Sequence, residues 1–164
     1  MNITSFEEFK DLAERGTFVP VCKEIMADLL TPVSAFLKIA EHADYAFLLE
    51  SVEGGEHVGR YSFLGKDPFL ILRARGGHTT IERGGETSES DRPFMDTLRG
   101  LMTDFKSPYV PGLPRFTGGA VGYLGYGAAS WFEPVLGDLG EGPDGSDQAG
   151  FMLFDTVLAF DHVQ

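Results

Sequence analysis

The chain has 164 residues, of which 43% are hydrophobic and 23% are charged, a composition typical of a folded domain with a substantial core. Its formal net charge of −12 repels phosphate backbones, so no nucleic acid partner is expected. No apolar run is long enough to span a membrane, and the N-terminus has no secretory pattern. The single cysteine, Cys22, excludes an internal disulfide. These features together predict a cytoplasmic protein.

Two capped helices are predicted in the N-terminal part of the sequence. Ser5 and Glu8 match a capping box ahead of apolar residues at helical spacing, and Gly16 is expected to end this helix. Thr31 as N-cap and Pro32 at the first helical position predict the start of a second helix.

The stretches expected to form strands in the first half are 17–23, 45–51, 61–64, 69–74 and 78–83. The run 45–51 is almost continuously apolar, which predicts burial on both of its faces. Gly76-Gly77 separates the last two stretches and is typical of a two-residue hairpin turn.

A third helix is predicted from Pro93 to about Phe105, with apolar residues along one face. Two more strands are expected, a Gly-rich one at 116–126 and a strongly hydrophobic one at 151–160. The polar, acidic run 84–91 predicts a turn. The stretch of about 137–150 is rich in Gly and acids and predicts a flexible loop, because it buries too little apolar surface to offset its ordering entropy.

The order of these elements predicts the fold class. The helices are scattered among hairpins and do not alternate regularly with strands. This pattern favours an α+β fold with mostly antiparallel sheets, about three helices packed on them, and a single domain over residues 1–164.

Common catalytic signatures are missing from the sequence. The four histidines, His42, His57, His78 and His162, fall on separate predicted elements without metal-ligand spacing, so no metal site is expected. The glycine-rich run 118–127 lacks the Gly-Lys-Ser/Thr ending of a phosphate loop, and close packing between strands is the favoured explanation.

The segment Leu48-Leu49-Glu50-Ser51 places a carboxylate at the end of an apolar strand. A buried carboxylate is costly to desolvate unless a cation or several donors meet it. Composition alone favours an internal partner for Glu50, either Arg60 or Lys66, over the ammonium group of an incoming ligand, and leaves both interpretations open.

Four sequence blocks give the chain a resemblance to anthranilate synthase component I, a chorismate-utilising enzyme family. Residues 47–65, FLLESVEGGEHVGRYSFLG, resemble the tryptophan-binding segment of that family. The blocks 30–39, LTPVSAFLKI, 116–126, FTGGAVGYLGY, and 151–163, FMLFDTVLAFDHV, resemble its preceding helix, its Gly-rich strand and the strand that enters its catalytic half. The resemblance is specific because the blocks keep their order over nearly the whole chain.

The resemblance implies that the chain is the N-terminal regulatory region of such a subunit. The complete subunit uses Mg²⁺ to convert chorismate to anthranilate and pyruvate, with ammonia from a glutamine amidotransferase partner. Its chorismate and Mg²⁺ residues are expected in a C-terminal half outside these 164 residues. No catalytic residue and no cofactor is therefore assigned to this chain, which is expected to be inactive alone.

The same resemblance implies that the chain binds L-tryptophan as a feedback inhibitor. A carboxylate would meet the ligand's α-ammonium group, hydroxyl and backbone donors its carboxylate, and apolar walls its indole. The residues expected at this site are Pro32, Leu49, Glu50, Ser51, Arg60, Tyr61 and Ser62.

One departure from the family pattern and two alternatives accompany this interpretation. Gly127 and Ser130 stand where the family usually has Asp and Arg, so no ion pair is expected from these positions. The corresponding region of aminodeoxychorismate (p-aminobenzoate) synthase component I is one alternative. A stand-alone binding module without enzymatic activity is the other.

Overall fold

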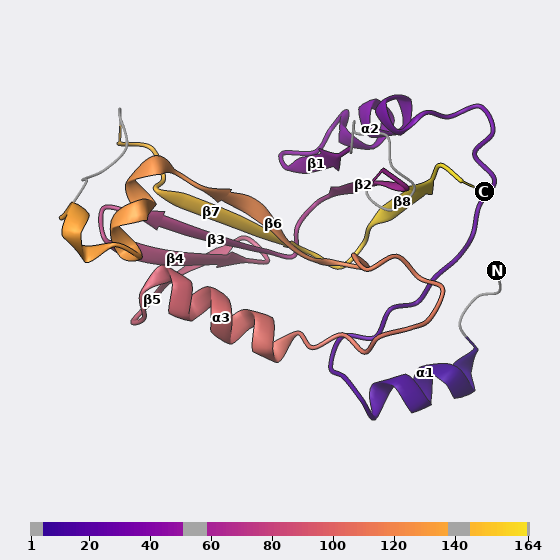
Figure 1. Ribbon diagram of the computed structural model, residues 1–164, viewed down its shortest axis with the longest axis horizontal. Coiled ribbons are helices and arrows are strands. Elements are labelled where there is room, and N and C mark those ends of the chain that lie inside the picture. Colours follow the sequence, from indigo (N-terminus) through magenta and orange to yellow (C-terminus); the bar gives the residue numbers. More distant parts are fainter. Residues whose placement is uncertain (1–4, 51–58, 138–144, 164) are drawn as a thin grey trace. The chain divides into compact units, whose positions relative to one another are not determined.

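The computed structural model describes residues 5–50, 59–137 and 145–163 (Figure 1). Its fold is α+β with two antiparallel sheets, as the sequence predicts. The α-helices in the described part of the chain are α1 (Phe6–Ala13), α2 (Pro32–Ala40) and α3 (Phe94–Asp104). The strands are β1 (Ala46–Leu49), β2 (Tyr61–Lys66), β3 (Leu70–Arg75), β4 (His78–Arg83), β5 (Glu86–Ser90), β6 (Gly119–Leu124), β7 (Ala149–Phe154) and β8 (Leu158–Asp161), and two short 3-10 helices are η1 (Tyr126–Trp131) and η2 (Pro134–Leu136).

The chain forms two compact units where the sequence suggests one domain. The first unit spans Met1–Pro68, Asp104–Gly119 and Phe154–Gln164, and the second spans Phe69–Thr103 and Ala120–Leu153. Each unit contains one sheet. Both are therefore built from segments that are distant in the sequence.

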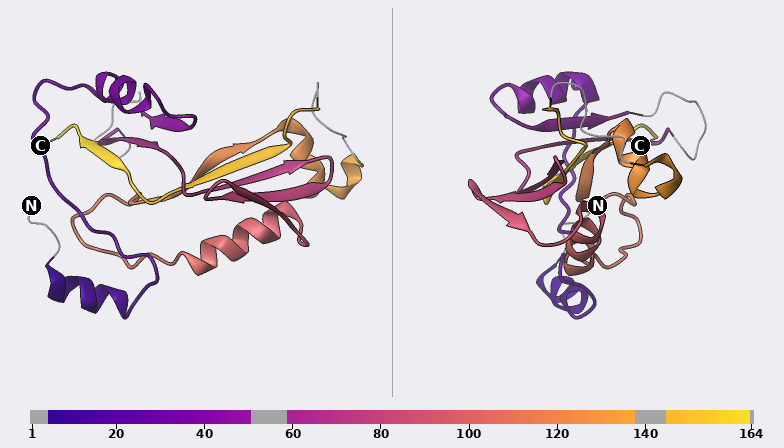
Figure 2. Two further views of the ribbon diagram at one scale, coloured as in Figure 1. Left: turned by 180° about the vertical axis from the view of Figure 1, so that it is seen from behind. Right: turned by 90° about the vertical axis from the view of Figure 1, so that its left-hand side faces the viewer.

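The first unit is organised around a three-stranded sheet in the order β1-β2-β8. Phe47, on β1, packs its ring edge-on against Phe116 and Phe154, at 6.1 and 4.7 Å between ring centroids. Helix α2 packs on β1 and β2 and lies beside β1 in every view (Figures 1 and 2). Contrary to the expectation of burial on both faces, β1 is an edge strand, and Leu49 at its end is 45% exposed.

Both predicted helix starts are confirmed. Ser5 and Glu8 form the capping box of α1, and Thr31 caps α2 with Pro32 in its first turn. Gly16 has a different role from the expected helix stop. A Cβ at this position would lie 2.5 Å from the Lys106 carbonyl oxygen, so a close approach of two backbone segments requires the glycine.

The second unit contains a five-stranded sheet in the order β5-β4-β3-β7-β6. The predicted hairpin is confirmed, since Gly76 and Gly77 both have positive φ and join β3 to β4 through the pair Arg75–His78. The expectation of a turn over 84–91 is wrong. Gly84-Gly85 repeats the same tight turn, and the following residues form β5, an edge strand with a largely exposed face.

Helix α3 runs along the second unit's sheet (Figure 1) and buries Phe94 and Thr97. Thr97 was not expected on the buried face, but its hydroxyl shares a 2.8 Å hydrogen bond with Ser90. Met102, one of the apolar residues that the sequence predicts along one face of this helix, is 43% exposed.

Several predicted strand and loop boundaries differ from the structure. Residues 17–23 form no strand, although the backbone N–H groups of Thr17 and Phe18 donate to the Lys106 carbonyl. The hydrophobic run 151–160 is divided between β7 and β8, which belong to different sheets, so one apolar stretch serves both units. The expected loop 137–150 ends in β7, and its residues 138–144 lie outside the described range. Residues 53–56, whose two central glycines predict a turn, also lie outside it.

Close packing explains the Gly-rich strand β6. A Cβ on Gly122 would lie 2.0 Å from the Gly150 carbonyl oxygen of β7. Two backbones approach here at a distance that no side chain permits. No helix in the described ranges is long and apolar enough to cross a membrane.

Candidate functional site

The predicted ligand residues meet at one end of the first unit's sheet. Strand β1 pairs antiparallel with β2, and the last pair of residues at this end is Leu49 with Phe63. Glu50 follows Leu49, and Ser62 precedes Phe63, so the two strands bring Glu50 next to the Arg60–Ser62 segment.

Helix α2 brings Pro32 to the same end. Only residues 41–45 connect α2 to β1, and the helix packs on that strand, so the chain reverses direction between them. The helix has 9 residues and the strand 4, which makes both about 13 Å long. Pro32, at the start of the helix, therefore lies at the end of β1 that leads to Glu50.

Glu50 is exposed, contrary to the expectation of a buried carboxylate. The internal partners favoured for it are also wrong, because Arg60 pairs with Asp161 and Lys66 with Asp67. Among the described residues, no cation forms an ion pair with Glu50. Its carboxylate thus faces water at the end of the strand.

Arg60 has a partner within the protein. Its Nε donates to Asp161 Oδ1 at 3.0 Å and its Nη2 donates to Asp161 Oδ2 at 2.6 Å, which is a bidentate pair. The guanidinium also lies 5.0 Å from the centre of the Tyr61 ring. The hydrogen bonds from Arg60 hold the pKa of Asp161 below its ordinary value, and the same bonds raise the pKa of Arg60.

Ser62 is buried, with 2% of its surface exposed. Its hydroxyl shares a 2.8 Å hydrogen bond with His162 Nε2, in which the imidazole tautomer decides the donor. The backbone N–H of His162 donates to the Arg60 carbonyl at 2.9 Å. Ser62 and Arg60 therefore both bind the end of β8.

The other predicted residues fall into two groups. Leu49 and Tyr61 lie beside Glu50, where the half-exposed Leu49 offers apolar surface and Tyr61 packs against Phe63 at 6.0 Å. Ser51 lies outside the described residues. The structure thus gathers Pro32, Leu49, Glu50 and the 60–62 segment at one end of one sheet.

Sequence reasoning missed Asp161 and His162. Both follow the apolar run of β8, as Glu50 follows that of β1. The signal that indicates Glu50, a polar residue at the end of a hydrophobic strand, is therefore also present at the end of β8.

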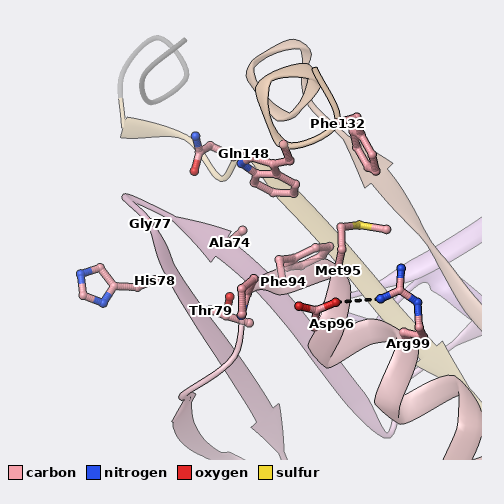
Figure 3. Close-up of a pocket in the computed structure, with 12 residues that line it drawn as sticks. Ala74, Gly77, His78, Thr79, Phe94, Met95, Asp96, Arg99, Phe132 and Gln148 are labelled. Carbon is pink, nitrogen blue, oxygen red and sulfur yellow. Dashed lines mark hydrogen bonds and ion pairs between the residues drawn. The ribbon is translucent and has the colours of Figure 1, made fainter. Parts of the chain in front are cut away.

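A separate hollow of about 360 Å³ lies in the second unit, between α3, the β3–β4 hairpin and η1 (Figure 3). Phe94, Trp131 and Phe132 contribute aromatic surface, and Asp96 pairs with Arg99 at 2.7 Å. The predicted ligand residues that the structure describes, which are all but Ser51, do not line it. The opposite charges of Asp96 and Arg99 therefore pair with each other.

In residues 5–50, 59–137 and 145–163, no three His, Cys, Asp or Glu side chains are placed to share a metal ion.

Comparison with known proteins decides the family. The chain is 42% identical over 160 residues to anthranilate synthase component 1 of Synechocystis sp., a match that covers 97% of this chain. It is 40% identical over 161 residues to the protein of that name from Acetivibrio thermocellus, covering 98% of this chain. This chain belongs to the anthranilate synthase component I family.

The family match concerns a part of those proteins. The chain spans about a third of the length of the curated relatives it matches, 32% for the two named above. The crystal structure of anthranilate synthase component I from Streptococcus pneumoniae is similar at a TM-score of 0.50 and 27% identity, covering 86% of this chain and 29% of that one. No protein-family model matches the chain.

Proposed function

We propose that the chain is the N-terminal, tryptophan-binding regulatory region of an anthranilate synthase component I. The observation that carries this proposal is the position of Glu50. Its exposed carboxylate, without a cation partner among the described residues, lies at the end of the sheet where α2, β1 and β2 meet. A carboxylate in this position is suited to the ammonium group of an amino acid.

The surrounding residues supply the other features that L-tryptophan needs. Leu49 offers half-exposed apolar surface, and Pro32 lies at the same end of the sheet. We assign Leu49 and Pro32 to the indole, and Ser51 with the neighbouring backbone to the ligand carboxylate. Because Arg60 and Ser62 bind β8, we assign them to holding the site in place, with Tyr61 between them.

The expected energies require both apolar and polar contacts. Burial of an indole of about 150–250 Å² at about 25 cal/mol per Å² contributes about 4–6 kcal/mol. Micromolar affinity corresponds to about 8 kcal/mol. The remainder must come from polar contacts, and the pairing of Glu50 with the α-ammonium group is the largest one available.

In the complete protein, we propose that this region inhibits the conversion of chorismate and ammonia to anthranilate and pyruvate. That reaction would use Mg²⁺ and a glutamine amidotransferase subunit in the cytoplasm, with its reacting groups bound outside this chain. Inhibition requires tryptophan to bind one state of the enzyme more tightly than another. Chorismate and tryptophan must then weaken each other's binding by the same factor.

Calorimetry with L-tryptophan tests the proposal on the chain itself. We expect saturable binding by the wild type and at least tenfold weaker binding by Ser51→Phe, because the larger side chain would occupy the ligand's place. The control is Ser88→Ala, a change at an exposed position on β5. Ser34→Ala would be a poor control because the Ser34 side chain belongs to the capping box of α2. Equal affinities of the wild type and Ser51→Phe for L-tryptophan would refute the proposed binding site.

A further inference from the structure

The end of β8 carries the two side chains that bind the ligand end of β2. Asp161 accepts a bidentate pair of hydrogen bonds from Arg60, and His162 shares a hydrogen bond with Ser62. We call Arg60, Ser62, Asp161 and His162 the β8 clamp. All four are described residues of the first unit.

The clamp lies directly beside Glu50. Strand β2 is the central strand, with β1 on one side and β8 on the other. Its residue Ser62 pairs with Phe160 of β8, and Glu50 follows the pair Leu49–Phe63 on the β1 side. Alternate residues of a strand share a face, so the side chains of Phe160 and His162 lie on the face of Ser62.

Several hydrogen bonds fix the positions of the β8 clamp residues. The buried Ser62 hydroxyl has His162 as its partner, so removing the imidazole leaves a polar group buried without that bond. Asp161 Oδ1 also accepts from the Val163 N–H at 3.1 Å, and the His162 N–H donates to the Arg60 carbonyl. The position of the β2 end therefore depends on the position of the β8 end.

We propose that the β8 clamp positions the ligand end of β1 and β2 and couples ligand binding to strand β8, with His162 and Ser62 as its central positioning residues. This inference rests on the proposed tryptophan site. Ligand held by Glu50 restricts the start of β2, and the clamp transmits that restriction to residues 161–163. Loss of the clamp loosens the site without removing a ligand contact.

Affinity measurements with paired variants test the positioning role. We expect Ser62→Ala and His162→Ala each to weaken L-tryptophan binding about tenfold, and the double variant to be no weaker than either one, since all three remove the same hydrogen bond. His162→Gln should recover part of the affinity, because its amide can again bond the Ser62 hydroxyl. Asp161→Asn weakens the same clamp at a less buried position and serves if Ser62→Ala does not fold.

Two control variants separate positioning from general stability. Thr97→Val removes a buried hydroxyl that bonds Ser90 in the second unit, and His42→Gln changes an exposed histidine. Both should leave the affinity within twofold of the wild type, even where Thr97→Val lowers the melting temperature. A loss of affinity that follows melting temperature in all variants, including Thr97→Val, would overturn the inference.

Hydrogen exchange measured residue by residue reads the coupling directly. Saturating L-tryptophan should slow exchange of the His162 and Val163 amides at least threefold in the wild type and not in Ser62→Ala. If tryptophan binds but leaves these amides unchanged, the coupling is refuted and the tryptophan site stands. If the wild type does not bind tryptophan, the proposed function fails and this inference fails with it.

Discussion

Gly122 of β6 lies against Gly150 of β7 so closely that a Cβ on Gly122 would stand 2.0 Å from the Gly150 carbonyl oxygen and 2.6 Å from the Phe151 Cα. Both obstacles are backbone atoms, which cannot rotate away as a side chain can. The pairing of these two strands thus requires glycine at position 122.

Gly122→Ala should therefore destabilise the chain by about 1–3 kcal/mol, the usual cost of forcing extra volume into a packed region. The matched control is Gly100→Ala in helix α3, where the nearest atom to a new Cβ is the flexible Arg92 side chain at 3.9 Å. That change should stabilise the helix by about 0.5–1 kcal/mol. Urea denaturation measures both, and equal effects of the two alanines would contradict the packing argument.

Helix α2 depends on its N-terminal cap. The Thr31 hydroxyl accepts from the Ser34 N–H at 3.1 Å, and the Ser34 hydroxyl bonds back to the Thr31 N–H at 2.9 Å. Thr31→Ala should cost about 1 kcal/mol, whereas Thr31→Ser, which keeps the hydroxyl, should cost much less. Thermal unfolding of both variants gives the comparison, and identical losses would show that the cap does not stabilise the helix.

Acid should weaken the Arg60–Asp161 pair. Hydrogen bonds from Arg60 lower the pKa of Asp161 in the folded chain, so the pair stabilises the protein above the unfolded pKa of about 3.9. That contribution disappears as the pH falls through the lower, folded pKa. The wild type should melt above Asp161→Asn at pH 7, and the difference should shrink as the pH falls below about 4. A difference that is constant with pH would contradict this assignment.

The opposite sign applies to His78. Its Nδ1 bonds the Glu89 carboxylate across β4 and β5, which raises the pKa of His78. This pair stabilises the fold fully below the unfolded pKa of about 6.5 and loses its effect as the pH rises through the folded pKa. NMR titration should show a lower His78 pKa in Glu89→Gln than in the wild type. An unchanged pKa would exclude Glu89 as the cause.

The sequence predicted secondary structure well where a residue's interactions are with residues a few positions away. Ser5, Thr31 and Pro32 mark helix starts through bonds within a few residues, and Gly76-Gly77 marks a turn through its φ angles. It predicted strand boundaries and sheet membership less well, because these depend on pairing between segments that are far apart in the sequence. The run 151–160 gives no local sign that it divides between two sheets, because its pairing partners β2 and β3 lie far away in the chain.

The candidate site shows the same division. The apolar run before Glu50 indicated a strand end, and the resemblance selected the residues around it. The cation partners of Glu50 were predicted wrongly because the sequence does not show that Asp161 reaches Arg60 across 101 positions. Exposure of Glu50 follows from the edge position of β1, which only the sheet order reveals.

The central claim is that Glu50 recognises the ammonium group of tryptophan. Comparing the affinities of L-tryptophan and indole-3-propionate, which lacks that group, tests it most directly in wild type and Glu50→Gln. We predict that the wild type prefers L-tryptophan at least tenfold and that Glu50→Gln, which has nearly the same shape without the charge, reduces this preference to about twofold. An undiminished preference in Glu50→Gln would contradict the account.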